Sequence, residues 1–290
     1  MAFGVWSGGR RRVRLDPAAL KSYVSWQMLL SADYHTHPQG HQVRSYTLEL
    51  LQPWVHRARQ RNIRSIAFTD HDRYHAGVNF DVVQRLREQN EDIEILIGVE
   101  LDNDPVSSAA GRRWVERHWQ KLDFVLGSIH YLAGESEMFD RPDQEIQVTS
   151  RGTGRAFAEY ITELERLIVR GNIDCLAHLD LVKIHDLRPE AYDPANLFGP
   201  ILKLAKRHGL AIEASSAGWR KKVGEQYPHE TILRLANEYG VPITTASDAH
   251  SYAQVGEDYE RLAAVLERAG VTRTATFWQH RQQAASGSNQ

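Results

Sequence analysis

Residues 93–100 read Ile93-Glu94-Ile95-Leu96-Ile97-Gly98-Val99-Glu100. Nearly every residue of this run is apolar, whereas a strand with one face in water alternates apolar and polar residues. Continuous apolar character is typical of a parallel strand that helices cover on both faces. A glutamate stands directly after the last apolar residue. The run therefore predicts a buried parallel strand with a carboxylate at its end.

Six further apolar runs of similar length are spread along the chain and predict strands. Together with residues 93–99 they make seven, the others being 28–34, 63–69, 124–129, 173–177, 210–214 and 241–246. Helical patterns lie between them and after the last one, at 45–60, 79–89, 112–120, 154–170, 194–208, 228–239 and 257–269. Strands that alternate with helices predict parallel pairing through right-handed crossovers. Seven such units favour a barrel-like (β/α) closure, although an open doubly wound sheet has the same local pattern.

The two ends of the chain and one internal segment depart from this rhythm. Residues 1–27 form an N-terminal extension, with a flexible basic arm around Arg10-Arg11-Arg12 and a short helix that begins at Asp16-Pro17. The arm is interpreted as solvated, with phosphate contact as the alternative. Residues 28–283 form the barrel domain, and 284–290 a small, polar, disordered tail. Residues 133–154 are polar and predict a long loop on the rim where the strands end.

Composition narrows the class of protein. The 290 residues carry a formal net charge of −2, which gives no reason to expect a nucleic-acid or membrane partner. Cys175 is the single cysteine, so no intramolecular disulfide can form, and a reducing cytoplasm is the expected location. The sequence has no apolar run long enough to span a membrane and no signal peptide.

Histidine, aspartate or glutamate stands at the carboxyl end of every predicted strand. In order these are His35, His37 and His41; Asp70, His71 and Asp72; Glu100; His130; His178 and Asp180; Glu213; and Asp248 and His250. The carboxyl ends of the strands of a parallel barrel meet at one rim, where active sites lie. Each residue by itself also has a structural interpretation, as a helix cap or a hydrogen-bonded histidine. Their recurrence on all seven strands favours a metal centre instead.

The types of ligand indicate the kind of metal. Imidazoles and carboxylates without a thiolate cluster favour zinc, manganese or iron over a structural cysteine site. Seven of the 14 histidines and several carboxylates exceed what one ion can hold, so two or three divalent ions are expected. Clustered ions suit hydrolysis of phosphate esters, because they generate a nucleophile and neutralise phosphoryl charge.

These motifs resemble the PHP (polymerase and histidinol phosphatase) family of metallophosphoesterases. The matching stretches are His35-Thr36-His37, Thr69-Asp70-His71, Gly98-Val99-Glu100, Gly127-Ser128-Ile129-His130, Leu176-Ala177-His178 and Ser247-Asp248-Ala249-His250. The resemblance implies a distorted, TIM-like (β/α)7 barrel, which agrees with the count of seven strands, and a trinuclear metal site. It implies one metal on His35, His37, Glu100 and Asp248, a second on His41, His71 and His250, and a third on Glu100, His130 and His178.

Within the family, two segments resemble those of histidinol-phosphate phosphatases. They are residues 213–221, which include Gly218-Trp219-Arg220-Lys221, and residues 171–180. The resemblance implies that Arg220 grips the substrate phosphate, and a planar guanidinium suits two phosphate oxygens at once. A basic surface turn is the alternative for this segment.

The sequence therefore predicts a cytoplasmic, metal-dependent phosphomonoesterase that hydrolyses L-histidinol phosphate. A metal-bridging hydroxide would attack phosphorus. A metal-bound water, Asp248, His250 or Asp70 would protonate the leaving group, and the 133–154 loop with Trp219 would close on the organic part. The first alternative is a PHP phosphoesterase that acts on nucleotides or oligonucleotide ends. A non-catalytic barrel is a second, and an amidohydrolase that uses Lys183 is a third. No oligomeric state is predicted.

Overall fold

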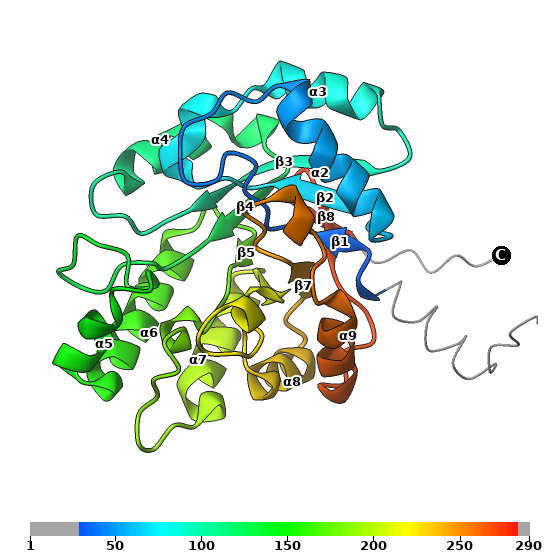
Figure 1. Ribbon diagram of the computed structural model, residues 1–290. Helices are drawn as coiled ribbons and strands as arrows, with labels where there is room; N and C mark the ends of the chain where they lie inside the picture. The colour runs from blue at the N-terminus through cyan, green and yellow to red at the C-terminus, as the bar shows by residue number, and fades with distance from the viewer. Residues whose placement is uncertain (1–28, 284–290) are drawn as a thin grey trace, which may run out of the picture.

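The computed structural model describes residues 29–283, and its centre is a sheet of seven parallel strands in chain order, β1 to β7. Each strand is followed by helical structure before the next begins, so all the connections run on the outside of the sheet (Figure 1). The strands are β1 Ala32–Asp33, β2 Ser65–Phe68, β3 Glu94–Leu101, β4 Phe124–Gly127, β5 Cys175–Leu176, β6 Ala211–Ser215 and β7 Ile243–Ala246.

Helices cover the outer face of this sheet. Helices α2, α3 and α4 lie on one side of it, and α6 to α9 lie on the other (Figure 1). The helices are α2 Leu48–Gln60, α3 Phe80–Glu88, α4 Ser108–His118, α5 Glu145–Arg151, α6 Thr153–Arg170, α7 Pro194–Arg207, α8 Glu230–Tyr239 and α9 Tyr259–Arg268. Short 3₁₀ turns complete the rim, namely η1 Asp72–Gly77, η2 Trp119–Lys121, η3 Leu181–Lys183, η4 Ala217–Arg220 and η5 Tyr252–Gln254.

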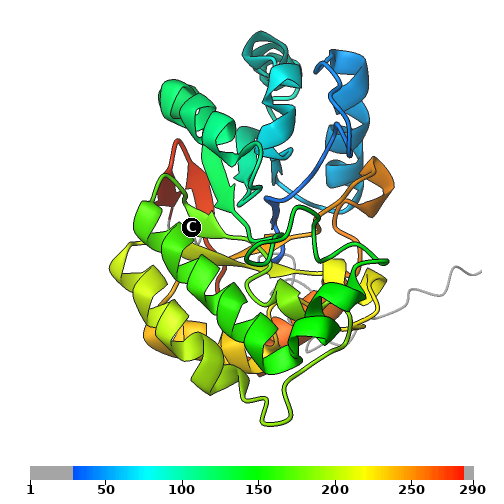
Figure 2. The same ribbon diagram turned by 90° about the vertical axis from the view of Figure 1, so that its left-hand side faces the viewer.

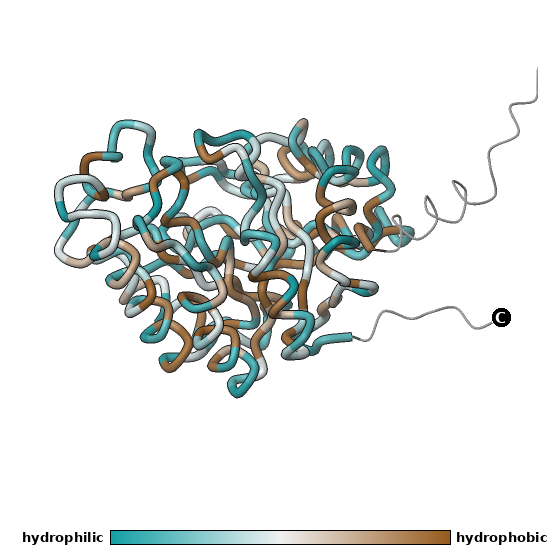
Figure 3. Tube along the Cα trace, turned by 90° about the horizontal axis from the view of Figure 1, so that it is seen from below, coloured by the Kyte–Doolittle hydropathy of each residue, from teal (hydrophilic) through white to brown (hydrophobic). Residues whose placement is uncertain are grey.

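Local sequence explains where several of these helices begin and end. The side chains of Thr47, Asn79 and Asp193 accept hydrogen bonds from the first free backbone N–H groups of α2, α3 and α7. Helix α8 ends at Gly240, which adopts the left-handed conformation that glycine tolerates best. Figure 3 shows apolar and polar colour alternating along the helices, as expected where one face packs on the barrel.

The sheet closes where β7 meets β1. The Tyr34 N–H donates to the Thr245 carbonyl (3.1 Å), the His37 N–H donates to the Ala249 carbonyl (2.8 Å), and the Thr245 hydroxyl donates to the Ala32 carbonyl (2.7 Å). The structure is therefore a (β/α)7 barrel, as predicted, and not the open sheet that the sequence left as an alternative. The carboxyl ends of all seven strands share one rim.

A hairpin closes the amino end of the barrel. Strands β8 (Thr276–Trp278) and β9 (Arg281–Gln283) pair with each other outside the barrel sheet (Figure 2). Phe277 packs against Phe124 and Tyr34 inside the barrel, with ring centroids 4.9 and 6.3 Å away. Its N–H donates to the Tyr34 hydroxyl (3.1 Å). This hairpin was not among the predicted strands.

The segment predicted as a single long loop at 133–154 is partly wrong, because its second half is helical. Polar residues, Pro142 and three glycines favoured a loop, but α5 occupies Glu145–Arg151 and buries Val148 completely. Gly152, with φ of +83°, ends α5, and α6 begins at the next residue.

The predictions for the two ends of the chain fall outside the described residues. The basic arm, the short helix that begins at Asp16-Pro17 and the polar tail lie outside residues 29–283, so the proposed domain boundaries stay predictions. Within residues 29–283, no helix is long and apolar enough to cross a bilayer.

Candidate metal centre

A cavity of about 580 Å³ opens at the carboxyl rim of the barrel. Of the predicted site residues it is lined by His41, His71, Glu100, His130, His178, Arg220, Asp248 and His250. His35, His37 and Asp70 are buried beneath or behind this lining. The structure thus brings residues from six of the seven strand ends to one place.

The His35-x-His37 pair lies at the floor of the cavity. Both side chains are buried, with ring centroids 4.9 Å apart. The Nε2 atoms of His35 and His37 lie 3.3 and 3.5 Å from Glu100 Oε2. His37 Nε2 is also 3.2 Å from Asp248 Oδ1. His71 Nδ1 lies 3.0 Å from the same oxygen, so one carboxylate oxygen of Glu100 faces three imidazoles at once.

Within residues 29–283, four sets of side chains are compact enough to hold a metal ion, with one ligand atom from each residue within 4.8 Å of the others. The sets are His35, His37 and Glu100; His37, His71 and His250; Glu100, His130 and His178; and His71, Asp102 and His130. Because they share members, the four sets form one continuous cluster.

The hydrogen bonding of this cluster fits metal ions. His35 Nε2, both ring nitrogens of His37, and Glu100 Oε2 are buried and have no hydrogen-bond partner within the described chain. Buried polar atoms are almost always paired, so several unpaired ones that converge indicate a bound group. Imidazole and carboxylate donors suit divalent ions. The residues present therefore fit divalent metals.

The charges of the cluster also fit this interpretation. Burial alone would raise the pKa of Glu100, but the facing imidazoles of His71, His35 and His130 lower the pKa well below its usual value. Burial lowers the pKa of His250 to about 4 and that of His71 well below its usual value. Near pH 7 Glu100 is therefore charged and His71 and His250 are neutral, which are the forms that bind metal. Against the effect of burial, neighbouring carboxylates raise the pKa of His35 well above its usual value and that of His130 to about 10, so metal binding at these two imidazoles would release protons.

Glu213 on β6 positions two of the predicted ligands. His35 Nδ1–H donates to Glu213 Oε2 (2.9 Å), and the backbone N–H of His178 donates to Glu213 Oε1 (2.8 Å). This fixes the tautomer of His35 and turns its Nε2 toward Glu100. Carboxylates that hold metal-binding histidines in this way are a common feature of metal sites.

Asp102, two residues after Glu100, lies beside His130 much as Glu213 lies beside His35. Its Oδ2 lies 3.1 Å from His130 Nδ1 and 3.8 Å from His71 Nδ1, and it also pairs with Arg73. Asp102, at the end of the same strand, supports this side of the cluster. Asp102 was not among the predicted site residues, although the Glu100-x-Asp102 spacing is the same signal as His35-x-His37.

The loop that carries Asp248 is held from below by Asp33. The hydroxyl and N–H of Ser247 donate to Asp33 (2.6 and 2.9 Å), as does the N–H of Gly256 (3.1 Å). Asp248 itself has φ of +50°. A non-glycine residue in this region is strained, and such strain collects at functional sites.

Two predicted residues lie at the margins of the cluster. His41 is exposed, and its ring centroid lies 4.5 Å from that of His250, but it belongs to none of the compact sets. Asp70 lies behind His37, where it accepts from the Tyr46 hydroxyl (2.6 Å) and the Gln39 N–H (2.9 Å). Burial raises the pKa of Asp70 to about 7.

Arg220 lies in the wall of the cavity and grips the Asp248 loop. Its Nη2 donates to the carbonyls of Ser247 (2.6 Å) and Asp248 (3.2 Å). Its Nη1 has no hydrogen bond and lies 3.4 Å from Glu257. Trp219, expected to close over the substrate, instead packs under the guanidinium of Arg261 (4.4 Å) and does not line the cavity.

Lys183 cannot bridge metal ions in this structure, which removes the basis of the amidohydrolase alternative. Its side chain is fully buried, with Nζ 2.8 Å from Asp180 and 2.9 Å from Glu225. It also donates to the Gln226 carbonyl (2.9 Å). All three N–H bonds of the ammonium thus point away from the metal cluster, into an ion-pair network.

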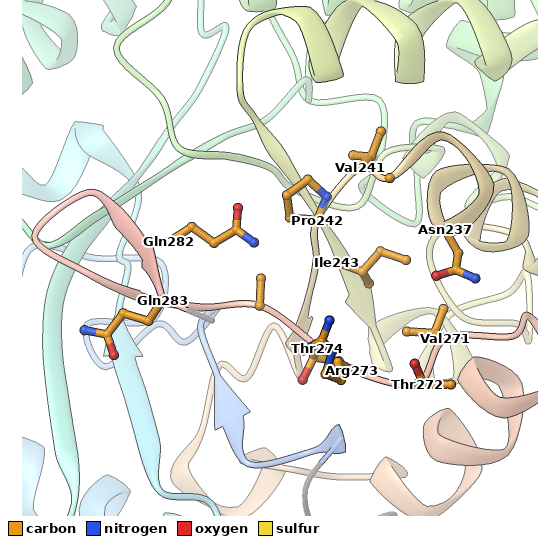
Figure 4. A pocket seen from close by; sticks show the side chains of 12 residues that line it. Asn237, Val241, Pro242, Ile243, Val271, Thr272, Arg273, Thr274, Gln282 and Gln283 are labelled. Atoms are coloured by element: carbon orange, nitrogen blue, oxygen red, sulfur yellow. The ribbon is translucent and has the colours of Figure 1, made fainter. Parts of the chain in front are cut away.

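A second cavity, of about 290 Å³, opens at the amino end of the barrel (Figure 4). It lies between the start of β7, including Pro242 and Ile243, and the chain that leads into β8, including Arg273 and Thr274. Within the described residues its lining contains no histidine, aspartate or glutamate. The chemistry of the molecule is therefore concentrated at the other end.

A barrel with a cluster of histidines and carboxylates at its carboxyl rim defines the class of metal-dependent hydrolases. The chain matches the PHP domain over residues 33–217 and the PHP-associated family over residues 226–267. It therefore belongs to the PHP family, and it is a histidinol-phosphatase-like, metal-dependent hydrolase of that family.

Similar proteins agree with this assignment. The chain is 31% identical over 188 residues to a probable histidinol-phosphatase of Deinococcus radiodurans, which covers 64% of this chain and 68% of that protein. It is 26% identical over 257 residues to a probable phosphatase of Thermoanaerobacter sp. (strain X514), covering 84% and 89% of the two chains. The crystal structure of histidinol phosphate phosphatase from Lactococcus lactis, complexed with zinc, L-histidinol and phosphate, shares the fold. It has a TM-score of 0.69 at 19% identity and covers 88% of this chain and all of that one.

Proposed function

We propose that this protein hydrolyses L-histidinol phosphate to L-histidinol and phosphate with the help of two or three divalent ions. The observation that carries the proposal is the cluster of buried, unpaired imidazole and carboxylate atoms in the floor of the 580 Å³ cavity. The substrate follows from the resemblance to histidinol-phosphate phosphatases and from the 31% identical relative of that name.

The proposed ligands fall into three sets that share members. The first is His35, His37, Glu100 and Asp248; the second is His41, His71 and His250; and the third is Glu100, His130 and His178. The compact geometry supports most of these members, with His37 rather than His41 nearest to His71 and His250. Zinc, manganese or iron ions bound there would supply a nucleophile at neutral pH and neutralise the charge of the phosphoryl oxygens.

The remaining residues are assigned to substrate binding and proton transfer. Arg220 would hold the phosphate through its Nη1, which makes no hydrogen bond and lies 3.4 Å from Glu257, while its Nη2 keeps the Asp248 loop in place. His250 and Asp248 line the cavity and would serve proton transfer to the leaving oxygen. Asp70 would act on proton transfer only through His37, because it lies behind that imidazole.

Metal analysis of the purified protein and a substrate panel test this function. We expect two or three equivalents of divalent metal and release of phosphate from L-histidinol phosphate at a higher kcat/KM than from 3′,5′-nucleoside bisphosphates or short RNA. Chelation should abolish the activity and metal addition restore it. Inertness toward all small phosphomonoesters together with trimming of RNA ends would overturn the proposal.

A further inference from the structure

We propose that Asp140 selects a cationic substrate by binding the ammonium group of a small phosphomonoester. The proposal rests on the proposed function, because it places the organic part of that substrate in the metal cavity. It adds a residue that neither the ligand motifs nor the Arg220 segment contains.

Asp140 lies in the loop between β4 and α5, in the wall of the cavity beside Met138 and Pro142. The preceding residue, Phe139, fixes this part of the loop. The Phe139 ring is fully buried, its N–H donates to the His130 carbonyl (2.9 Å), and its own carbonyl accepts from His185 Nε2 (2.7 Å). The loop is therefore tied back to a proposed metal ligand, and the position of Asp140 at the cavity is set.

The carboxylate of Asp140 has no partner in the protein. It forms no hydrogen bond or ion pair with any residue the structure describes, and its Oδ1 is shielded from solvent. Burying a charged group without a partner is unfavourable, and such groups are normally paired. An unpaired carboxylate oxygen in the wall of a cavity therefore indicates that a ligand with a positive charge completes it.

Neighbouring charges of the same loop show a different arrangement. Arg141 pairs with Glu137 (2.8 Å) and lies 3.4 Å from Asp143, and these three side chains are each more than half exposed. Arg141 also lines the cavity next to Asp140, but it pairs with Glu137 and Asp143 and forms no ion pair with Asp140.

The charges of the cavity are therefore divided. Arg141, Arg220 and Lys221 contribute positive charge to its wall, and Asp140 contributes a negative charge outside the compact ligand sets. A phosphomonoester with an ammonium group matches both, with phosphate at the metal cluster and ammonium at Asp140. A nucleoside bisphosphate or an oligonucleotide would bring a second phosphate toward the carboxylate, and like charges repel.

Asp140 is not part of the metal cluster itself. The compact ligand sets of the described chain do not include it. A role in binding the organic part of the substrate is therefore separate from a role in holding metal.

The test uses pairs of phosphomonoesters that differ only in the ammonium group. One pair is L-histidinol phosphate and its deamino analogue, and the other is 3-aminopropyl phosphate and propyl phosphate. We expect the wild-type holoenzyme to prefer the ammonium member of each pair, and D140N to lower that kcat/KM ratio by about 10- to 100-fold, mainly through KM. Calorimetry should show the same loss for the binding of L-histidinol. D140E should retain part of the preference, because it keeps the charge.

D143N is the matched control, because it removes one negative charge from the exposed side of the same loop. We expect it to leave both ratios within twofold of wild type. An unchanged ratio in D140N, or equal losses in D140N and D143N, would overturn the assignment of Asp140. If the wild-type enzyme showed no preference for the ammonium member of either pair, the assignment of Asp140 would also be overturned. This part of the test needs no variant, so it does not depend on whether D140N folds. Preference in the aminopropyl pair without turnover of L-histidinol phosphate would support Asp140 and overturn only the proposed substrate.

Discussion

The two ends of the barrel differ in whether their buried polar atoms are hydrogen-bonded. At the amino end, His280 Nδ1 pairs with Asp174 (2.8 Å), its Nε2 donates to the Trp119 carbonyl (2.9 Å), and the Tyr34 hydroxyl accepts from Ser65 (3.0 Å). At the carboxyl end, ring nitrogens of His35 and His37 and an oxygen of Glu100 are buried without hydrogen bonds.

This difference indicates that the amino end contributes mainly to stability and the carboxyl end to function. Paired polar groups and packed rings stabilise the amino end, whereas unpaired imidazoles and carboxylates at the carboxyl end are unfavourable until a ligand binds them. Stability of the carboxyl end should therefore depend on bound metal, because a ligand that binds only the folded state stabilises it. Substitutions at the carboxyl end should lower metal content and activity, and substitutions at the amino end should lower the free energy of unfolding.

The largest effect is expected at the carboxyl end, on activity. H35A and H37A each remove an imidazole that faces Glu100 and should lower kcat/KM by about three orders of magnitude, because metal ions contribute several kcal/mol to such reactions. The far-ultraviolet circular dichroism should stay that of the wild type. Metal content by mass spectrometry and phosphate release check this, with H208A, an exposed histidine after α7, as the control. Full metal content and activity in either variant would contradict the assignment.

The next effect is expected at the amino end, on stability. F277A removes a ring that fills the barrel interior against Phe124 and Tyr34 and should lower the free energy of unfolding by about 3–5 kcal/mol. Metal content and KM should change little, because the site lies at the other rim. Urea unfolding checks the stability.

Y252A, at an exposed aromatic residue on η5, is the control for F277A and should change stability by no more than about 0.5 kcal/mol. If F277A impaired metal binding as strongly as stability, the two ends would be coupled and the comparison would fail.

The sequence predicted the barrel, and most of the residues that the structure brings together at its rim, for the same physical reason. Strands buried on both faces are continuously apolar, so they stand out from the helices, and their ends locate the rim where His35, Glu100 and Asp248 meet. The Glu100-x-Asp102 spacing is the same local signal as His35-x-His37, so it would also have predicted Asp102. These features are local, so a single sequence shows them.

The parts that were missed depend on contacts between distant residues. Glu213 binds His35 across 178 positions, and His280 binds Asp174 across 106, so no local spacing reveals either pair. Asp140 lies in a polar loop without periodicity, and only the cavity shows that it differs from Asp143. Helix α5 is short, and its polar sequence gave little periodic signal.

The smallest expected effect is a pH dependence at the amino end. Burial alone would lower the pKa of His280, but the hydrogen bond to Asp174 and the charge of that carboxylate outweigh it, and the Trp119 carbonyl and Asp123 add to the rise. The pKa of His280 in the folded state is therefore above that of the unfolded chain. Stabilisation by His280 should be complete below about pH 6.5 and disappear as the pH rises through the folded-state value.

H280Q should accordingly destabilise the protein more at pH 5.5 than at pH 9. The difference should not exceed about 1 kcal/mol, because the pair is partly exposed and solvent screens it. Urea unfolding of both proteins at the two pH values measures it. D174N should remove the same pH dependence, and it should also destabilise at both pH values because Asp174 accepts from the Val125 N–H (2.7 Å). A larger effect of H280Q at pH 9 would mean that the neutral imidazole, stacked on Trp119 at 3.7 Å, and not the ion pair, holds the hairpin.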